Sequence, residues 1–192
     1  MYVLNDNFKK ERCPWCLSDP LYIEYHDKVW GVPMFGSQQL FAFLMLEGMQ
    51  AGLSWLTILK KQQALEEAFL NFNPTQLADL SDDALENILQ NPKIIRNRRK
   101  VYAIRQNARA FLELSADRDF SDFIWNFSDG KTLQNNWRSL DEVPAETVAS
   151  CAMSKDLKSQ GFSFVGPKIC YAFMQATGMV NDHVVNCFRY ES

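Results

Sequence analysis

Residues 159–178, SQGFSFVGPKICYAFMQATG, have the pattern of a helix, a tight turn and a second helix. Gly161 and Gly178 stand where the two helices are expected to end, since glycine accepts the left-handed conformation that closes a helix. Gly166 lets the turn approach another group closely, and the helix that follows would present free N–H groups that suit a phosphate. This is the shape of a helix-hairpin-helix element, which contacts the DNA backbone without reading bases, although a glycine-rich corner in a helical core has the same pattern.

Helical periodicity runs through nearly all of the remaining sequence, without strand alternation or repeats. The predicted helices cover residues 53–70, 74–80, 81–90, 101–112, 119–127, 145–161 and 166–178. Asn73 and Ser81 are expected to begin two of them. Residues 128–143 are the least regular and predict a long surface connection. The sequence therefore predicts an all-α protein with a single domain over residues 1–192 and its core in 11–190, or two helical lobes folded as one unit.

The composition predicts a soluble protein with a sizeable core, because 47% of its 192 residues are hydrophobic. The longest apolar run, residues 40–46, is too short to cross a membrane, and the N-terminus lacks the layout of a signal peptide. We therefore expect a cytoplasmic monomer with no membrane partner. The net charge of −3 argues against general nucleic-acid binding, but residues 93–100, KIIRNRRK, concentrate five cationic side chains that could form one basic face.

Glu47 is a single carboxylate at the end of an apolar helix. It lies in residues 46–61, LEGMQAGLSWLTILKK, directly after the apolar run 40–46. If Ser37 caps a helix that runs to Gly48, the neighbours of Glu47 one turn earlier are apolar. A helix that is apolar all round is a buried helix, and a buried carboxylate is costly without a cation or hydrogen-bond donors. Glu47 is therefore expected to border a cleft or to await a charged partner.

Cysteines and histidines pair at the two ends of the chain. Cys13 and His26 lie near the start, and His183 and Cys187 near the end, which makes a Cys₂His₂ set of the kind that binds zinc. The second pair has the i, i+4 spacing of one helix face, whereas the first pair must come from a loop. Ordinary core histidines and cysteines are the alternative. Cys16 completes a CPWC motif, so a thiol oxidoreductase that uses Cys13 and Cys16 is a further alternative, which requires both thiols to be free of metal.

Five stretches, in this order, closely resemble the 3-methyladenine DNA glycosylase I family (Tag) of the helix-hairpin-helix glycosylase superfamily. They are ERCPWCLSDPLYIEYHDKVWGVP, LEGMQAGLSWLTILKK, IIRNRRK, GFSFVGPKICYAFMQATG and VNDHVVNC, and the likeness spans about residues 11–190. The resemblance implies a base-excision repair enzyme that acts on alkylated double-stranded DNA and releases 3-methyladenine. It also implies one structural zinc ion, held by Cys13, His26, His183 and Cys187, which joins the two ends of the chain; Cys16 is not among the ligands.

The same resemblance assigns a base-binding pocket. The carboxylate that recognises the base falls on Glu47, and the aromatic positions fall on Tyr25 and Trp55 and also on Tyr22 and Trp15. Methylation at N3 makes adenine cationic, and a buried carboxylate beside aromatic faces favours a cation over the neutral base. Because methylation also makes the base a good leaving group, Glu47 need not act as a general acid.

The resemblance further assigns the contacts with DNA. A flipped nucleotide leaves a gap in the base stack, and the turn with Gly52 and Leu53 at its tip is expected to fill it. The hairpin at Gly166 and Lys168 is expected to hold a phosphate, and residues 93–100 are an auxiliary contact or merely a solvated helix start.

Lys168 also raises a mechanistic alternative. In bifunctional glycosylases of the endonuclease III type, a lysine at this place of the hairpin attacks the sugar, with an aspartate in a later segment. Here that segment reads VNDH, with Asn181 at the place of the aspartate. We therefore expect a monofunctional hydrolase, with a glycosylase that is also a lyase as one alternative. A zinc-stabilised module that binds DNA or a modified nucleotide without cleaving it is another.

Overall fold

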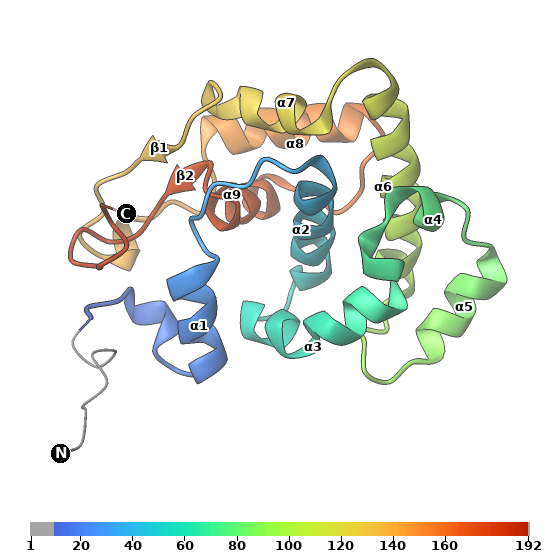
Figure 1. Cartoon of the computed structure of the whole chain (residues 1–192), viewed down its shortest axis with the longest axis horizontal. Helices are drawn as coiled ribbons and strands as arrows, with labels where there is room; N and C mark the ends of the chain where they lie inside the picture. The colour runs from blue at the N-terminus through green and yellow to red at the C-terminus, as the bar shows by residue number, and fades with distance from the viewer. Residues whose placement is uncertain (1–9, 192) are drawn as a thin grey trace.

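The structure, a computed structural model, describes residues 10–191, and almost all of its regular elements are helical (Figure 1). The α-helices are α1 Pro20–Lys28, α2 Ser37–Gln50, α3 Trp55–Ala68, α4 Pro74–Ala78, α5 Asp82–Gln90, α6 Arg98–Asp117, α7 Phe120–Trp125, α8 Val148–Ser159 and α9 Pro167–Ala176. Single 3-10 turns are η2 Pro14–Cys16, η3 Leu70–Phe72, η4 Asn126–Ser128 and η5 Leu140–Glu142. The prediction of an all-α protein is confirmed. No helix within residues 10–191 has both the length and the apolar composition needed to cross a membrane.

Helix α2 lies in the middle of the molecule, where it packs against α3, α6, α7 and α9 (Figure 1). Its residues from Leu44 to Met49 are all buried, as its apolar sequence predicts. The expected cap is wrong, because Gly36 is the N-cap and Ser37 is the first helical residue. The Ser37 hydroxyl instead donates to the carboxylate of Asp119 at 2.9 Å and accepts from the backbone N–H of Ser121, so it joins α2 to the start of α7. The helix also runs past Gly48, to Gln50.

Polar caps explain where the other predicted helices begin. The side chains of Asn73 and Ser81 accept backbone hydrogen bonds at the starts of α4 and α5, which confirms both expected caps. Ser54 caps α3 in the same way, so this helix begins two residues later than its apolar spacing starts. In α6 the expected apolar stripe is buried except for Leu112, which is 37% exposed.

Helices α8 and α9 form the predicted pair of helices, which pack against each other; residues 160–166 connect them, starting with a turn at Gln160 and Gly161, and α9 packs against α2. Gly161 has φ +89° and Gly178 has φ +72°, as expected of residues that close helices in the left-handed conformation. A Cβ atom at Gly178 would lie 2.4 Å from the backbone nitrogen of Pro33, so only glycine fits where the chain after α9 passes the segment before α2. Gly166 is the N-cap of α9 and offers no side-chain cap.

The segment predicted as a surface connection is fixed to the C-terminal part of the chain. Strands β1 Leu133–Gln134 and β2 Val180–Asn181 pair in parallel. Further along, the N–H of Val185 donates to the carbonyl of Trp137 at 2.9 Å. The first described residues also join this region, because the N–H of Phe188 donates to the carbonyl of Glu11. The two ends of the described chain therefore lie on the same side of the molecule (Figure 1).

Candidate functional site

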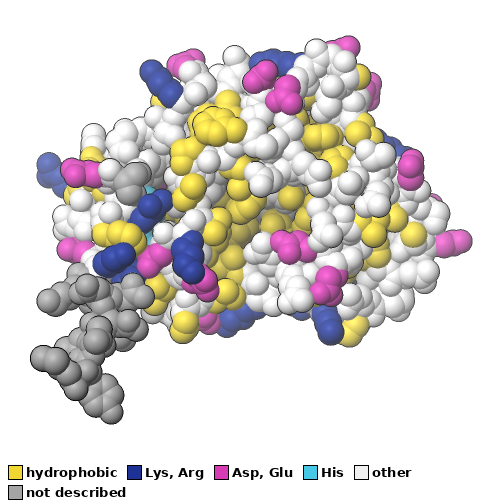
Figure 2. All heavy atoms as spheres, in the orientation of Figure 1, with side chains coloured by type: hydrophobic (Ala, Val, Ile, Leu, Met, Phe, Trp, Pro, Cys, Tyr) yellow, Lys and Arg dark blue, Asp and Glu magenta, His cyan; other side chains and the backbone are white. Residues whose placement is uncertain are grey.

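A cavity of about 410 Å³ lies between α1, the C-terminal half of α2, the start of α3, α9 and the segment around η5. Its walls are formed by Trp15, Tyr22, Tyr25, Trp30, Glu47, Gln50, Trp55, Leu140, Val143, Pro144, Ala145, Lys168, Tyr171, Ala172, Gln175 and Asp182. The glutamate and all four aromatic residues of the expected base pocket are among them. Apolar side chains cover much of the middle of the face seen in Figure 2, and most charged side chains lie around its edge.

Glu47 is buried in the wall of this cavity without a partner. Its side chain is carried by the last turn of α2, and only 3% of the residue is exposed. Within residues 10–191 no hydrogen bond or ion pair reaches its carboxyl group. Burial raises the pKa of Glu47 to about 8, because the charged form loses its hydration and gains nothing in return. A cation in the cavity would supply the missing partner and favour the carboxylate.

Aromatic rings form the rest of the cavity wall near Glu47. The rings of Tyr25 and Trp55 lie 5.5 Å apart at 48°, and Trp15 meets Tyr22 edge-on at 4.9 Å. Burial, with a further contribution from Glu47, raises the pKa of Tyr25 well above its usual value, so its phenol stays neutral. The indole N–H of Trp55 is buried and makes no hydrogen bond of good geometry in the described part of the chain, although its contact with the Tyr25 phenol opposes the rise in that pKa. Aromatic faces, a buried acid and an indole N–H that a ligand can engage together suit a flat, polar, cationic ring.

A second constellation lies beside the cavity, at the junction of the two chain ends. One ligand atom each from Cys13, His26, His183 and Cys187 lies within 4.8 Å of the other three, and all four residues are buried. His183 Nδ1 is 3.6 Å from the sulfur of Cys13 and 3.5 Å from that of Cys187, and His26 Nε2 is 3.4 Å from the sulfur of Cys187. Hydrogen bonds from Cys13 and from the two imidazoles hold the pKa of the Cys187 thiol well below its usual value. Four such donors that converge on one point can hold a metal ion.

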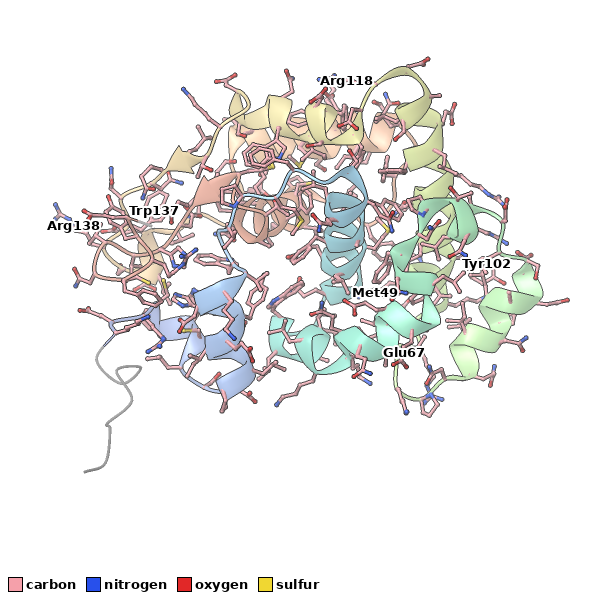
Figure 3. The ribbon with its side chains drawn as sticks, in the orientation of Figure 1. Met49, Glu67, Tyr102, Arg118, Trp137 and Arg138 are labelled. Atoms are coloured by element: carbon pink, nitrogen blue, oxygen red, sulfur yellow. The ribbon has the colours of Figure 1, made fainter. Side chains whose placement is uncertain are left out.

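The local structure around these four residues differs from the expected one. His183 lies in the irregular segment after β2 and Cys187 in the turns that follow it, rather than on a helix, and His26 lies in α1 rather than in a loop. The prediction of a helical pair was wrong because a tight series of turns also brings residues i and i+4 together. Trp137 packs against this cluster, close to the C-terminal segment (Figure 3).

Neighbouring groups orient both imidazoles. His26 Nδ1 is 2.9 Å from the carboxylate of Asp27, which also accepts a hydrogen bond from Arg12 at 2.8 Å. His183 Nε2 is 3.3 Å from the carbonyl of Trp30. In each ring the other nitrogen is the one that faces the cluster, which is the arrangement of metal-binding histidines with their outer hydrogen-bond partners.

Cys16 lies outside the cluster. Its thiol donates to the carbonyl of Cys13 at 3.2 Å, and burial raises its pKa to about 11. Both thiols of the CPWC motif are fully buried, and Cys13 belongs to the four-residue cluster. These features argue against a thiol oxidoreductase, which needs an accessible thiolate.

Lys168 lies in the first turn of α9 and lines the cavity. Asn181, at the place of the expected aspartate, uses its side chain to donate to the carbonyl of Tyr190 and to accept from the N–H of His183. Gly52 and Leu53 form a turn after α2, and Leu53 is 39% exposed. The structure thus places Lys168 and Glu47 in the wall of one cavity, while Gly52, Leu53 and Gly166 lie outside this wall.

A further buried acid, Asp182, which no sequence pattern singled out, also lines the cavity. Its Oδ1 accepts from Asn135 at 2.7 Å and Trp137 at 2.8 Å, and its Oδ2 accepts from Tyr171 at 2.6 Å and Gln175 at 2.7 Å. These four bonds fasten the segment after β1 to helix α9. The neighbouring histidine drew attention to the VNDH segment, but no spacing in the sequence reveals donors that come from 45 residues upstream.

Four of the five cationic residues in 93–100 are exposed, but the run offers less free charge than its sequence implies. The guanidinium of Arg98 pairs with Glu86 at 2.6 Å, and Lys100 is only 6% exposed. Arg99, between them, is exposed. The charge available for DNA on this helix start is therefore smaller than the sequence suggests.

Comparison with known proteins agrees with these features. The model of the methyladenine glycosylase family matches residues 15–190. The chain is 48% identical to DNA-3-methyladenine glycosylase 1 of Escherichia coli (strain K12) over 181 residues, which cover 94% of this chain and 97% of that protein. It is 47% identical over 177 residues to DNA-3-methyladenine glycosylase of Haemophilus influenzae, covering 92% of this chain and 96% of that one.

Solved structures give the same result. A crystal structure of 3-methyladenine DNA glycosylase I superposes with a TM-score of 0.92 at 49% identity, and the match covers 94% of this chain and all of the other. A structure of the Staphylococcus aureus enzyme, which concerns the recognition of 3-methyladenine, superposes with a TM-score of 0.89 at 37% identity, covering 92% of this chain and 95% of that one. With the family model and both relatives matched over nearly their whole length, this chain belongs to the methyladenine glycosylase family.

Proposed function

We propose that this enzyme hydrolyses the N-glycosidic bond of 3-methyladenine in alkylated double-stranded DNA and releases the free base. The observation that carries the proposal is Glu47, whose carboxyl group lies in the wall of an aromatic cavity and has no partner among residues 10–191. The similar proteins of E. coli and H. influenzae carry the name of this activity.

Glu47 recognises the positive charge of the methylated base. The raised pKa of about 8 reflects the lack of a partner, and a cationic base in contact with the carboxyl group lowers that pKa and pairs with the carboxylate. Neutral adenine offers no such compensation. One methyl group alone is worth only about 1–3 kcal/mol of discrimination, so charge recognition in a dry cavity supplies the remainder.

Tyr25, Trp55, Tyr22 and Trp15 enclose the flipped base. Their rings provide faces on which a planar cation stacks, and they exclude water from Glu47. Because the glycosidic bond of a cationic base is already activated, binding the base in this dry site promotes departure without a proton from Glu47. A water molecule completes the hydrolysis.

The turn with Gly52 and Leu53 fills the gap that the flipped nucleotide leaves in the duplex. Leu53 is an apolar side chain with 39% of its surface exposed at the tip of a turn, close in sequence to both Glu47 and Trp55. The helix-hairpin-helix element formed by α8 and α9 holds the DNA backbone, with phosphate at the N-terminus of α9 near Gly166 and Lys168.

The reaction is monofunctional and leaves an intact abasic site. A lyase needs a lysine whose amine is activated by a neighbouring base. Asn181 stands where the bifunctional relatives have an aspartate, and both oxygens of the next residue, Asp182, are occupied by four hydrogen bonds. Lys168 therefore serves as a cation that contacts phosphate.

One zinc ion joins the two chain ends through Cys13, His26, His183 and Cys187. Bond lengths of about 2.3 Å to sulfur and 2.0–2.1 Å to nitrogen place neighbouring ligands of a tetrahedral zinc about 3.6 Å apart. Three separations between sulfur and nitrogen atoms, of 3.4–3.6 Å, match this requirement, and the widest separation in the cluster, within 4.8 Å, would close by about 1 Å on binding. When bound, such an ion supplies structural cross-linking only, because four protein ligands leave no position for water or substrate.

The deciding experiment is incubation of purified protein with methylated duplex DNA, followed by chromatography of the released bases. We expect free 3-methyladenine with the strand unbroken. Binding of the methylated DNA without release of base at high enzyme concentration would instead support a non-catalytic binding module.

A further inference from the structure

The turn that carries Leu53 is closed by its own hydrogen bonds. The N–H of Leu53 donates to the carbonyl of Gln50 at 2.7 Å, and the side-chain amide of Gln50 donates to the carbonyl of Leu53 at 3.0 Å. Ala51 has φ −43° and ψ 117°, and Gly52 has φ +80°, which are the angles of a type II turn. The conformation of this turn therefore sets where the exposed side chain of Leu53 points.

Lys100 holds the point where α2 ends and this turn begins. Its ammonium group donates to the carbonyl of Met49 at 2.7 Å and to the carbonyl of Ala51 at 2.6 Å. The last carbonyls of a helix lack partners within the helix, and a cation there also compensates the negative end of the helix dipole. Met49 lies at the C-terminal end of α2, on the side of α6 (Figure 3).

Lys100 is badly placed for a direct DNA contact. It belongs to the basic run, but it is 6% exposed, and two of its three ammonium protons are directed at carbonyls inside the protein. Burying an ammonium group is costly, and burial indeed lowers the pKa of Lys100. An apolar residue would fill a buried position with a smaller desolvation penalty. We therefore take the role of the Lys100 charge to be its hydrogen bonds to the two carbonyls.

We propose that Lys100 is a positioning residue for base excision, which fixes the end of α2 so that the Leu53 turn is presented in one conformation to the DNA. This inference rests on the proposed function, since it assigns Lys100 a part in the step that flips the base. Glu47 lies three residues before the end of α2, in a helix that is also held by its packing against α3, α6 and α9. Lys100 therefore acts on the turn and leaves the base pocket intact.

Lys100→Met tests the proposal because methionine keeps the apolar stem and removes the two hydrogen bonds. We expect single-turnover excision of 3-methyladenine from duplex DNA to fall by about tenfold or more, the effect of losing well-formed charged contacts. The affinity for free 3-methyladenine should stay within about twofold, since Glu47 and the four aromatic residues of the cavity are unaltered and, of the turn residues 50–53, Gln50 alone lines the cavity wall. The salt dependence of DNA binding should not change, because no phosphate contact is lost.

Lys61→Met is the matched control. The ammonium group of Lys61 also donates to a backbone carbonyl, that of Lys93, at 2.7 Å, but this bond lies away from the turn. The control removes the same charge and the same kind of bond, and its single-turnover rate should stay within about twofold of that of the unaltered enzyme.

A double-mutant cycle with Leu53→Gly shows whether Lys100 acts through the turn. Once Leu53 is absent, Lys100→Met should have little further effect on the excision rate. If the methionine variant does not fold, Lys100→Arg takes its place in the cycle: full activity supports the proposal, and any loss must vanish in the Leu53→Gly background.

Several results would overturn the proposal. The proposal fails if Lys100→Met excises the base within twofold of the rate of the unaltered enzyme, or if Lys61→Met loses as much activity as Lys100→Met. It also fails if Lys100→Met loses affinity for free 3-methyladenine in proportion to its loss of rate, if its loss of rate persists in the Leu53→Gly background, or if its DNA binding depends less on salt. If the unaltered enzyme itself releases no 3-methyladenine, the proposed function fails, whereas normal excision by Lys100→Met refutes only the role of Lys100.

Discussion

Replacement of Glu47 by glutamine should stabilise the folded protein while it weakens recognition of the base. The carboxyl group of Glu47 has a pKa of about 8 in the folded chain, against a value of 4.5 without the protein around it. Below about pH 4.5 the group is protonated in both the folded and the unfolded chain, so it does not lower the free energy of unfolding. Between pH 4.5 and 8 the unfolded chain ionises and the folded chain does not, and the free energy of unfolding therefore falls as the pH rises.

The size of this loss follows from the difference in pKa. The interval from 4.5 to about 8 corresponds to about 5 kcal/mol at pH values above 8. Glutamine has the shape of the protonated acid and cannot ionise, so the free energy of unfolding of Glu47→Gln does not fall with this rise in pH. For a chain of this length, about 5 kcal/mol corresponds to a melting temperature higher by about 10–20 °C.

Thermal or urea unfolding of both proteins at intervals between pH 5 and 9 measures the effect. The difference in stability should be small at pH 5 and should grow steadily up to about pH 8. Both proteins share the same metal cluster, so the pH dependence of metal binding cancels in the comparison. Glu113→Gln, which alters an exposed glutamate of α6, should show no such growth. A constant difference across the whole range would refute the reasoning, because it would mean that the burial of Glu47 does not perturb its ionisation.

Further predictions concern the reaction and the metal cluster. The value of kcat/KM for excision should rise with pH up to about 8, since only the ionised Glu47 pairs with a cationic base, and a pH–rate profile of Glu47→Gln should lack this rise. His183→Ala should lose both bound metal and melting temperature, whereas Cys16→Ala should keep its metal; elemental analysis with thermal unfolding distinguishes the two, and the opposite pattern would show that the ligands are wrongly assigned. Borohydride should trap no covalent adduct on lesion DNA, and Lys168→Ala should bind DNA more weakly with the salt slope reduced by about one; an adduct that disappears in this variant would establish a lyase.

The sequence predicted best those features that depend on neighbours along one helix. The buried position of Glu47 followed from the apolar run before it, and the ends of α8 and α9 followed from Gly161 and Gly178, because both depend on local backbone geometry. The opposite wall of the cavity was not predictable in this way. Leu140 and Asp182 reach it from irregular segments, which carry no periodicity and are held by contacts far apart in sequence.

Lys100 shows a second limit of sequence patterns. Five cationic side chains within residues 93–100 indicate a solvated or DNA-binding face, yet the structure uses one of them inside the protein. The difference arises from tertiary structure: the start of α6 meets the end of α2, where free carbonyls need a donor. A pattern of charge cannot distinguish a cation that faces water from a cation that caps another helix 50 residues away.

The metal cluster and the base cavity are two sides of one wall. Trp30 lines the cavity, and its ring meets that of His183 at 4.6 Å; Trp15 also lines the cavity and lies 5.3 Å from the ring of His26. Asp182 precedes His183 directly. Since the ligands come from both ends of the chain, this wall is complete only when residues some 170 positions apart have met. A structural metal that holds them together would therefore act on base binding as well as on melting temperature, and the affinity of His183→Ala for 3-methyladenine should fall along with its metal content.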